Sequence, residues 1–363
     1  MIQTSFSYDA LPMRVRFGSG VIASLPEEIA RLGARRALVL CSPEQRDTGE
    51  AIAGALGDRS AGVLAEARMH VPVEVAARAR ARAAELGADA CVAVGGGSAI
   101  GLGKAVALEH GLPVVAVPTT YAGSEMTTVW GITENGRKRT GKDPRVLPAA
   151  VLYDPDLTLG LPIAMSVTSG FNAVAHAVEA LYAPDRSPVV SLMAEEGVRA
   201  MTEALPAVFA DGGDADARAK ALYASWLCGA TLGATTMSLH HKLCHALGGT
   251  LDLPHAATHT VVLPHALAHN QPAAPDAAEA LSRALHADDP ARRLWDLAGS
   301  LDAPRSLRDL GMSESDIDPI CDEVVNAPYA NPAPVTRESV RRLLHTAWTG
   351  DPPRPRPLKA TRP

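Results

Sequence analysis

The feature that most constrains the fold of this 363-residue chain is a change of apolar pattern near Leu161. Before that residue, short apolar runs typical of buried strands alternate with helical patterns, for example the run at 37–40 and the helix at 73–86. This alternation predicts an open, mostly parallel α/β sheet. After Leu161 the apolar residues recur with a helical period only, in segments at 170–183, 189–204, 215–232, 238–247, 277–285, 291–298 and 338–348. We therefore expect an α/β domain at 1–158, an all-helical domain at 159–350 and a Pro-rich, basic, disordered tail at 351–363.

The composition argues against several classes of partner. The formal net charge is −6 and the 34 Lys and Arg residues are scattered, so the chain lacks the basic patch of a nucleic-acid binder. No stretch reaches the roughly 18 apolar residues of a membrane span, and the N-terminus does not read as a signal peptide. The five cysteines show no C-x-x-C spacing, which favours reduced thiols, and Cys244 is interpreted as a small core residue. We expect a cytoplasmic protein that binds neither nucleic acid nor membranes.

A glycine turn within ACVAVGGGSAIGLGKAVAL indicates a phosphate-binding site. It falls between a strand and a helix, where bare backbone can approach a pyrophosphate and the N–H groups of the helix start can hold its charge. A second polar turn follows the next strand. The candidate cofactor-binding residues in the two turns are Gly95, Gly96, Gly97, Ser98, Thr119, Thr120 and Ser124. Such short motifs also occur as tight turns that bind nothing, and this one is not the common G-x-G-x-x-G pattern, so the glycine run alone is weak evidence.

The helical half carries five polar residues at suggestive spacing: Asn172, His176, His241, His245 and His255. The first two lie four residues apart, as do the next two, so each pair shares a helical face. His255 lies beyond a pair of glycines, 248 and 249, that should end the second helix, and we expect it in a loop. Taken singly, each histidine is more simply explained as a hydrogen-bonded core residue. The repeated spacing favours a metal site or a polar pocket.

Five separated segments, in order along the chain, carry a resemblance to a known family: GGGSAIGLGKAVAL, PTTYAGSEMTTVWGIT, SVTSGFNAVAHAVEALYAPDR, LHHKLCHALGGTLDLPHAATHTVVLPHALAHN and NPAPVTRESVRRLLHTAW. They resemble the maleylacetate reductases, a branch of the iron-containing alcohol dehydrogenase family, and the similarity extends to about Gly350. The resemblance implies a Rossmann-like N-terminal domain that binds NAD(P) and an all-α C-terminal domain, an architecture shared with dehydroquinate synthase. It also implies a homodimer.

The resemblance further implies where a metal ion would bind and why it is absent. In the metal-dependent members an Asp and three His hold the ion, and these positions correspond here to Asn172, His176, His241 and His255. Replacing the only anionic ligand by an amide removes the charge that offsets a divalent cation. Maleylacetate reductases share this departure, so we expect no metal, although three histidines can in principle still bind zinc.

The implied reaction is reduction of the C=C bond of maleylacetate to 3-oxoadipate with NADH or NADPH, in the degradation of aromatic compounds. The resemblance places His245 near the substrate, and we expect His241 and His245 to contact it. One of the histidines or Lys242 would donate the proton, unless Lys242 is simply a solvated helix residue. Two alternatives stay open: a metal-dependent alcohol dehydrogenase, which Asn172 counts against, and a non-redox relative such as a dehydroquinate synthase.

The choice between NADH and NADPH depends on the residue that follows the second strand. A carboxylate there would bond the ribose 2′-OH and repel a 2′-phosphate. This chain has Ser42, which carries no charge and can bond either group, while Glu44 and Arg46 lie close by in the sequence. We expect weak discrimination between the two cofactors.

Overall fold

A computed structural model describes residues 5–134, 137–326 and 328–354, and the chain forms two compact units. The sheet unit contains Ala10–Leu161 and Asp211–Gly233, and the helical unit contains the rest of the described chain. The sequence therefore passes from one unit to the other several times. This division differs from a single boundary at residue 158, because a helix from the second half of the chain returns to the sheet unit.

The sheet unit is built on six parallel strands in the spatial order β1-β8-β5-β4-β2-β3. Their bounds are β1 Arg14–Phe17, β2 Ala37–Cys41, β3 Ser60–Ala65, β4 Ala90–Gly95, β5 Val114–Pro118 and β8 Ala150–Tyr153. After β2 the chain adds β3 on one side and then crosses back to place β4 on the other. A crevice at the carboxyl ends of the strands next to such a reversal is the usual ligand site of an open α/β sheet.

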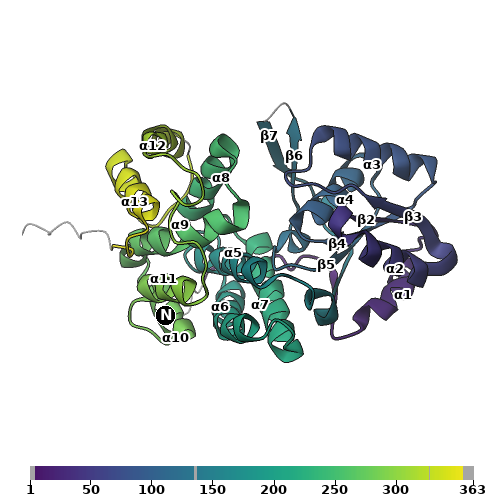
Figure 1. Cartoon of the computed structure of the whole chain (residues 1–363), viewed down its shortest axis with the longest axis horizontal. Coiled ribbons are helices and arrows are strands. Elements are labelled where there is room, and N and C mark those ends of the chain that lie inside the picture. The colour runs from purple at the N-terminus through teal and green to yellow at the C-terminus, as the bar shows by residue number, and fades with distance from the viewer. Residues whose placement is uncertain (1–4, 135–136, 327, 355–363) are drawn as a thin grey trace, which may run out of the picture. The chain divides into compact units, whose positions relative to one another are not determined.

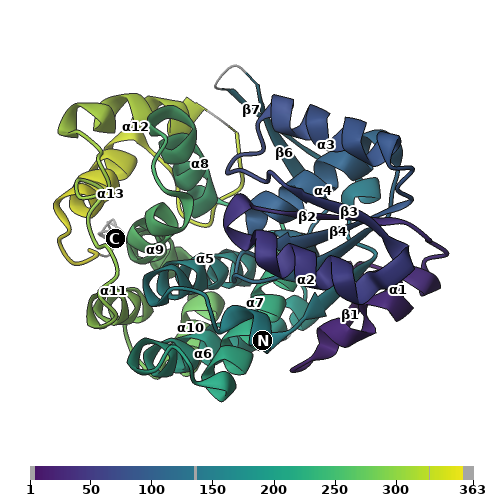
Figure 2. The ribbon, with the colours of Figure 1, turned by 45° about the vertical axis from the view of Figure 1, so that its right-hand side comes forward.

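Helices cover both faces of this sheet, as the near-continuous burial of β2, β4 and β5 requires. Helices α1 (Leu25–Arg31) and α2 (Arg46–Leu56) pack their apolar side chains on one face, where they share a core with Val39, Val92 and Val115. They lie together in front of the strands in Figure 2. Helices α3 (Val73–Glu85) and α4 (Gly97–His110) pack against each other, and α4 lies against β4 on the other face.

Helix α7 (Ala215–Ala234) completes the sheet unit from a distant part of the sequence. It approaches the turn at 123–126 so closely that a Cβ on Gly229 would lie 3.0 Å from the Cα of Gly123. A Cβ on Gly233 would overlap the carbonyl oxygen of Met126. Two small residues four apart thus allow direct contact between helix and turn backbones.

The helical unit is arranged around α5 (Ile163–Leu181), which is buried almost along its whole length from Ser166 onward. It packs between α6 (Pro188–Ala210) and α9 (His255–Asn270), as Figure 1 shows. The remaining helices are α8 Leu239–Leu251, α10 Pro275–Leu285, α11 Pro290–Ser300, α12 Ile317–Asn326 and α13 Arg337–Thr349. Apolar residues of α8, α9, α12 and α13 form one core cluster that includes Leu243, Val262 and Leu344.

The predicted strands and most predicted helices are present, and three details differ. Helix α8 does not end at Gly248 and Gly249 but runs to Leu251, because the residue that takes the left-handed conformation is Asp252, with φ of 52°. His255 is not in a loop: it is the first residue of α9, directly after Pro254. The β6–β7 hairpin (Val129–Glu134 and Arg137–Lys142) and α12 were not expected.

Two other expectations concern the tail and membranes. Residues 355–363 of the expected disordered tail lie outside the described residues. Within the described residues, no helix combines the length and the apolar character needed to cross a membrane.

Candidate active site

The residues predicted to bind the cofactor gather at one edge of the sheet. Ser42 follows β2, Gly95 ends β4 and Thr119 follows β5, and these neighbouring parallel strands end at the same edge. The backbone N–H of Thr119 donates to the carbonyl oxygen of Gly95 at 3.2 Å. The predicted turns are therefore in direct contact, beside the reversal of strand order.

Gln45 joins these turns and was missed by the sequence analysis. Its Nε2 donates to Thr119 Oγ1 at 2.7 Å, and a Cβ added to Gly95 would lie 2.5 Å from its Oε1. Gly95 has φ of 139°, so a side chain there would be strained as well as crowded. A Cβ on Gly96 would lie 2.8 Å from Thr120 Oγ1. The chain here keeps glycine where backbone must approach neighbouring polar groups, which is what a phosphate-binding turn requires.

Lys104 holds the second turn region against α4. Its side chain is fully buried, and Nζ lies between 2.6 and 2.9 Å from four oxygens: the carbonyls of Ser124, Thr127 and Val129, and the hydroxyl of Thr127. Burial lowers the pKa of Lys104 to about 7, and the nearby carboxylate of Glu125 opposes this effect. Ser124, a predicted cofactor residue, is thus tied through its backbone to the helix that begins at the glycine turn.

The predicted catalytic residues form a compact cluster of rings in the helical unit. The rings of His176 and His241 stack with centroids 5.1 Å apart and planes inclined by 27°, and His245 lies 6.2 Å from His241. Asn172 and His176 are buried on the same face of α5. The structure therefore brings together side chains from α5, α8 and α9 that are far apart in the sequence.

His259 lies at the centre of this cluster. Its ring centroid is 4.3 Å from that of His255, 4.7 Å from His240, 5.1 Å from His241 and 6.4 Å from His176. His240 Nε2 and His259 Nδ1 are hydrogen-bonded at 2.9 Å. Four residues separate His255 from His259 on α9, which repeats the spacing of the two predicted pairs.

Burial keeps much of the cluster neutral. It lowers the pKa of His176, His240 and His259 well below 6.5, and neighbouring histidines add to the effect. Cys244 is buried, and its sulfur lies 3.7 Å from His240 Nε2. Burial raises the pKa of its thiol well above 9.0. Its interpretation as a core residue is confirmed.

One carboxylate enters the cluster. Glu179 is fully buried on α5, and its Oε2 lies 2.8 Å from His241 Nδ1. Tyr329 lies near this carboxylate, and burial together with Glu179 raises the phenol pKa to about 12, so the hydroxyl stays protonated. Lys242 is partly exposed on α8, and within the described residues no hydrogen bond or ion pair joins its side chain to the cluster.

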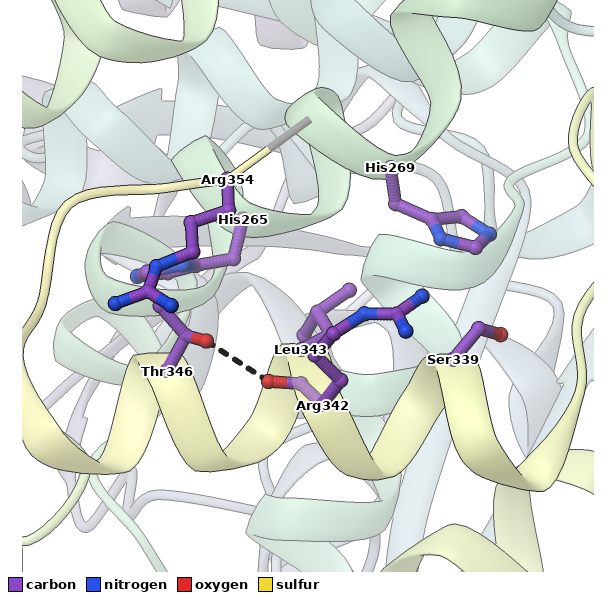
Figure 3. A pocket seen from close by; sticks show the side chains of 7 residues that line it. All are labelled: His265, His269, Ser339, Arg342, Leu343, Thr346 and Arg354. Atoms are coloured by element: carbon purple, nitrogen blue, oxygen red, sulfur yellow. Dashed lines mark hydrogen bonds between the residues drawn. The ribbon is translucent and has the colours of Figure 1, made fainter. Parts of the chain in front are cut away.

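Two small pockets elsewhere in the helical unit contain none of the predicted residues. Figure 3 shows one between α9 and α13, lined by His265, His269, Ser339, Arg342, Leu343, Thr346 and Arg354. Its volume of about 20 Å³ accommodates about one water molecule. The other, about 270 Å³, lies beside Tyr182 and Arg186. Neither is formed by the histidine cluster.

Comparison with known proteins identifies the family. Residues 12–155 match the iron-containing alcohol dehydrogenase family, and residues 166–348 match the C-terminal domain of the Fe-containing alcohol dehydrogenase family. A maleylacetate reductase from Burkholderia cepacia is 54% identical over 95% of this chain and 98% of its own length. The crystal structure of a maleylacetate reductase from Agrobacterium tumefaciens is 50% identical, with a TM-score of 0.94 over 97% of this chain and 100% of that one. The corresponding structure from a Rhizobium species has 50% identity and a TM-score of 0.93, with the same coverage.

The chain belongs to the iron-containing alcohol dehydrogenase family. Its fold is the one expected, a Rossmann-like domain with a parallel sheet and a helical C-terminal domain. Membership of this family makes the protein an NAD(P)H-dependent oxidoreductase.

The donor atoms in and around the histidine cluster bear on whether this chain binds a metal ion. Asn172 supplies a neutral amide in place of a carboxylate. Among the described residues, one group of three His, Cys, Asp or Glu side chains could hold a metal ion: His240, Cys244 and His259, each of which offers one donor atom within 4.8 Å of the other two. Within that group, His240 Nε2 and His259 Nδ1 are hydrogen-bonded to each other.

The sequence contained signals for two of the missed residues, Glu179 and His259. Glu179 lies three residues after His176 and seven after Asn172, on the same face of α5. His259 would have followed from the i,i+4 rule if His255 had been expected in a helix. Gln45 had no comparable signal, because its position depends on how β2 and β5 lie together in the sheet.

Proposed function

We propose that this protein reduces the C=C bond of maleylacetate to give 3-oxoadipate, with NADH or NADPH as the hydride donor, in the degradation of aromatic compounds. The proposal rests on sequence identity. Over nearly the whole chain, 50–54% of the residues are identical to those of proteins named maleylacetate reductase. The histidine cluster and the glycine turn supply the two kinds of group that such a reaction needs.

The proposed reaction has two bond-forming steps. Hydride from the nicotinamide adds to the alkene carbon β to the ketone, and the alkene electron pair moves onto the ketone oxygen to give an enolate. A proton then adds to the other alkene carbon, which lies between the ketone carbon and the carbon that received the hydride. The oxidised nicotinamide then leaves. An enolate flanked by two carboxylates can be held by hydrogen-bond donors and cationic side chains rather than by a metal ion.

We assign substrate contact to His241 and His245. The proton donor is one of the cluster histidines or Lys242, with Asn172, His176 and His255 forming the polar wall. The stacked rings of His176 and His241 and the short distance between His255 and His259 support a shared pocket. The partial exposure of Lys242 favours the histidines.

We further propose that catalysis needs no metal. The amide of Asn172 supports this, because the site lacks the anionic ligand of the metal-dependent members. Asn172→Asp restores that ligand and is expected to raise affinity for Zn²⁺ or Fe²⁺, measured by equilibrium dialysis with metal analysis of the protein. An affinity equal to that of the unaltered chain would contradict the assignment of position 172.

The cofactor proposal is that both NADH and NADPH are accepted. Ser42 follows β2 and its side chain carries no charge that would repel a 2′-phosphate. We expect kcat/KM values for the two cofactors within about a hundredfold, or roughly 2.7 kcal/mol. A larger ratio would mean that a charged group, Glu44 or Arg46, reads the 2′ position.

The deciding experiment is anaerobic oxidation of NADH in the presence of maleylacetate, with and without EDTA. Stoichiometric formation of 3-oxoadipate at an unchanged rate in EDTA supports the proposal. No turnover of maleylacetate would overturn the substrate assignment, and turnover lost in EDTA and restored by a divalent ion would overturn the metal-free mechanism. Light scattering of the same preparation tests the accompanying proposal of a homodimer, and cell fractionation tests the cytoplasmic location.

A further inference from the structure

The carboxylate of Glu179 is surrounded by hydrogen-bond donors from the start of α8. Its Oε2 accepts from the backbone N–H of Ser238 at 2.7 Å and faces His241 Nδ1 at 2.8 Å. Its Oε1 accepts from the backbone N–H of His240 at 2.8 Å, with the hydroxyl of Tyr182 at 3.4 Å. Each oxygen of this fully buried side chain therefore has a strong donor, and the negative charge lies at the N-terminus of a helix, where it is stabilised.

This arrangement determines which nitrogen of His241 carries the hydrogen. A carboxylate oxygen accepts but does not donate, so the short contact places a hydrogen on Nδ1 of His241. Nε2 is the nitrogen left for another partner, because it has no hydrogen bond among the described residues although it is buried. The same contact fixes the plane of the ring, which stacks on His176.

We propose that Glu179 is a positioning residue for the reduction: it holds His241 with a hydrogen on Nδ1 and the ring plane fixed, so that Nε2 faces the substrate and, when it also carries a proton, donates to the enolate. This inference rests on the proposed function, because it assumes that His241 contacts the substrate. A carboxylate that orients an imidazole in this way has large effects elsewhere, about 10- to 100-fold for metal-bound histidines and about 10⁴-fold in kcat for serine proteases.

Glu179 also has a structural role that the test must separate from the catalytic one. It receives two backbone N–H groups at the start of α8, so removing the side chain would leave buried donors unsatisfied. Glu179→Gln keeps the size of the side chain and one acceptor oxygen. Its amide group cannot accept from both Ser238 N–H and His240 N–H, and an amide nitrogen facing His241 would impose the opposite tautomer.

The experiment compares Glu179→Gln with His241→Ala and with the double variant. Glu179→Gln should lower kcat by about 100-fold and leave the KM for NADH within about twofold. Because Glu179 acts through His241, adding Glu179→Gln to His241→Ala should change kcat by less than about threefold, whereas independent effects would multiply. Glu279→Gln, on the exposed face of α10, is the matched control and should behave like the unaltered protein.

A second measurement does not require turnover. Imidazole ¹⁵N chemical shifts distinguish the two neutral tautomers, and the His241 signals, assigned by their loss in His241→Ala, should change pattern in Glu179→Gln. A purely structural role for Glu179 would lower the melting temperature without changing the tautomer, and that outcome would overturn the proposal, as would multiplicative effects in the double variant. If the unaltered protein does not turn over maleylacetate but the tautomer depends on Glu179, the substrate assignment alone has failed.

Discussion

His241 and His245 lie one turn apart on α8 and have different surroundings. His241 is buried, with its ring between His176 and Glu179, whereas His245 is exposed at the end of the ring cluster. The ring of His241 is held by its hydrogen bond to Glu179, and His245 faces solvent.

We predict that His241→Ala and His245→Ala each reduce turnover far more than cofactor affinity. Loss of a group that contacts the reacting enolate should cost about 10²- to 10⁴-fold in kcat/KM for maleylacetate. The NADH dissociation constant, measured by fluorescence titration, should stay within about twofold. His345→Ala, on the exposed side of α13, is the control. Near-normal turnover in both variants would show that the histidine cluster is not the substrate site.

Spacing within the sequence was sufficient to predict that some site residues lie together, but not others. Asn172 with His176, and His241 with His245, could be paired because each pair lies on one helix, where the i,i+4 rule applies. The contact between Glu179 and His241 joins two helices, and no periodicity in the sequence encodes such a distance. Glu179 was missed for a second reason, since a buried carboxylate in an apolar helix is uncommon.

At the scale of elements, α4 connects the two turns at the cofactor edge. Its first residues form the glycine turn and Lys104, two turns further on, holds the segment from Ser124 to Val129. A displacement of one turn would therefore move the other through α4.

We predict that Lys104→Met weakens NADH binding by about tenfold, or roughly 1.4 kcal/mol, because the Ser124 segment loses its attachment to α4. The oxygens that faced Nζ lose their donor, so the free energy of unfolding should fall by about 1–3 kcal/mol. Fluorescence titration with NADH and thermal unfolding measure the two effects. Lys142→Met, on the exposed end of β7, is the control. A loss of stability with unchanged NADH affinity would limit Lys104 to a structural role.

The elements that sequence patterns predicted well are those whose environment is uniform. Strands β2, β4 and β5 are buried along their length and appear as continuous apolar runs. Helix α9 was missed because His255 was expected in a loop beyond Gly248 and Gly249, whereas Pro254 directly precedes the first turn of the helix and Pro264 lies inside it. The β6–β7 hairpin was missed because it lies outside the six-stranded sheet and β7 carries many polar residues, so no alternating apolar pattern marks it.

At the scale of the whole molecule, buried neutral histidines make stability depend on pH. Burial lowers the pKa of His265, in the pocket of Figure 3, from 6.5 to about 4, although Asp351 opposes the shift. Between these values the unfolded chain binds a proton that the folded protein does not. The contribution of this group to stability is therefore complete above pH 6.5 and is lost as the pH falls towards 4.

We predict that the melting temperature falls as the pH is lowered from 7 to 5, and that His265→Gln reduces this fall. The contribution of His265 to the free energy of unfolding is on the order of 3 kcal/mol at most. Scanning calorimetry over this range measures the slope, with the exposed His110→Gln as the control. His176, His240 and His259 act in the same direction, so part of the slope should remain. An unchanged slope in His265→Gln would contradict the assignment.

The return of α7 to the sheet unit has a consequence for synthesis on the ribosome. When residue 161 leaves the exit tunnel, all six parallel strands have been made, but the helix that packs against the 123–126 turn has not. That surface stays uncovered until more than seventy further residues, up to the end of α7, have been synthesised. Helices α5 and α6 of the other unit emerge during that time. Neither unit can therefore be completed before synthesis of the other has begun. A nascent chain halted near residue 161 would present an open apolar surface to chaperones rather than a finished nucleotide-binding domain.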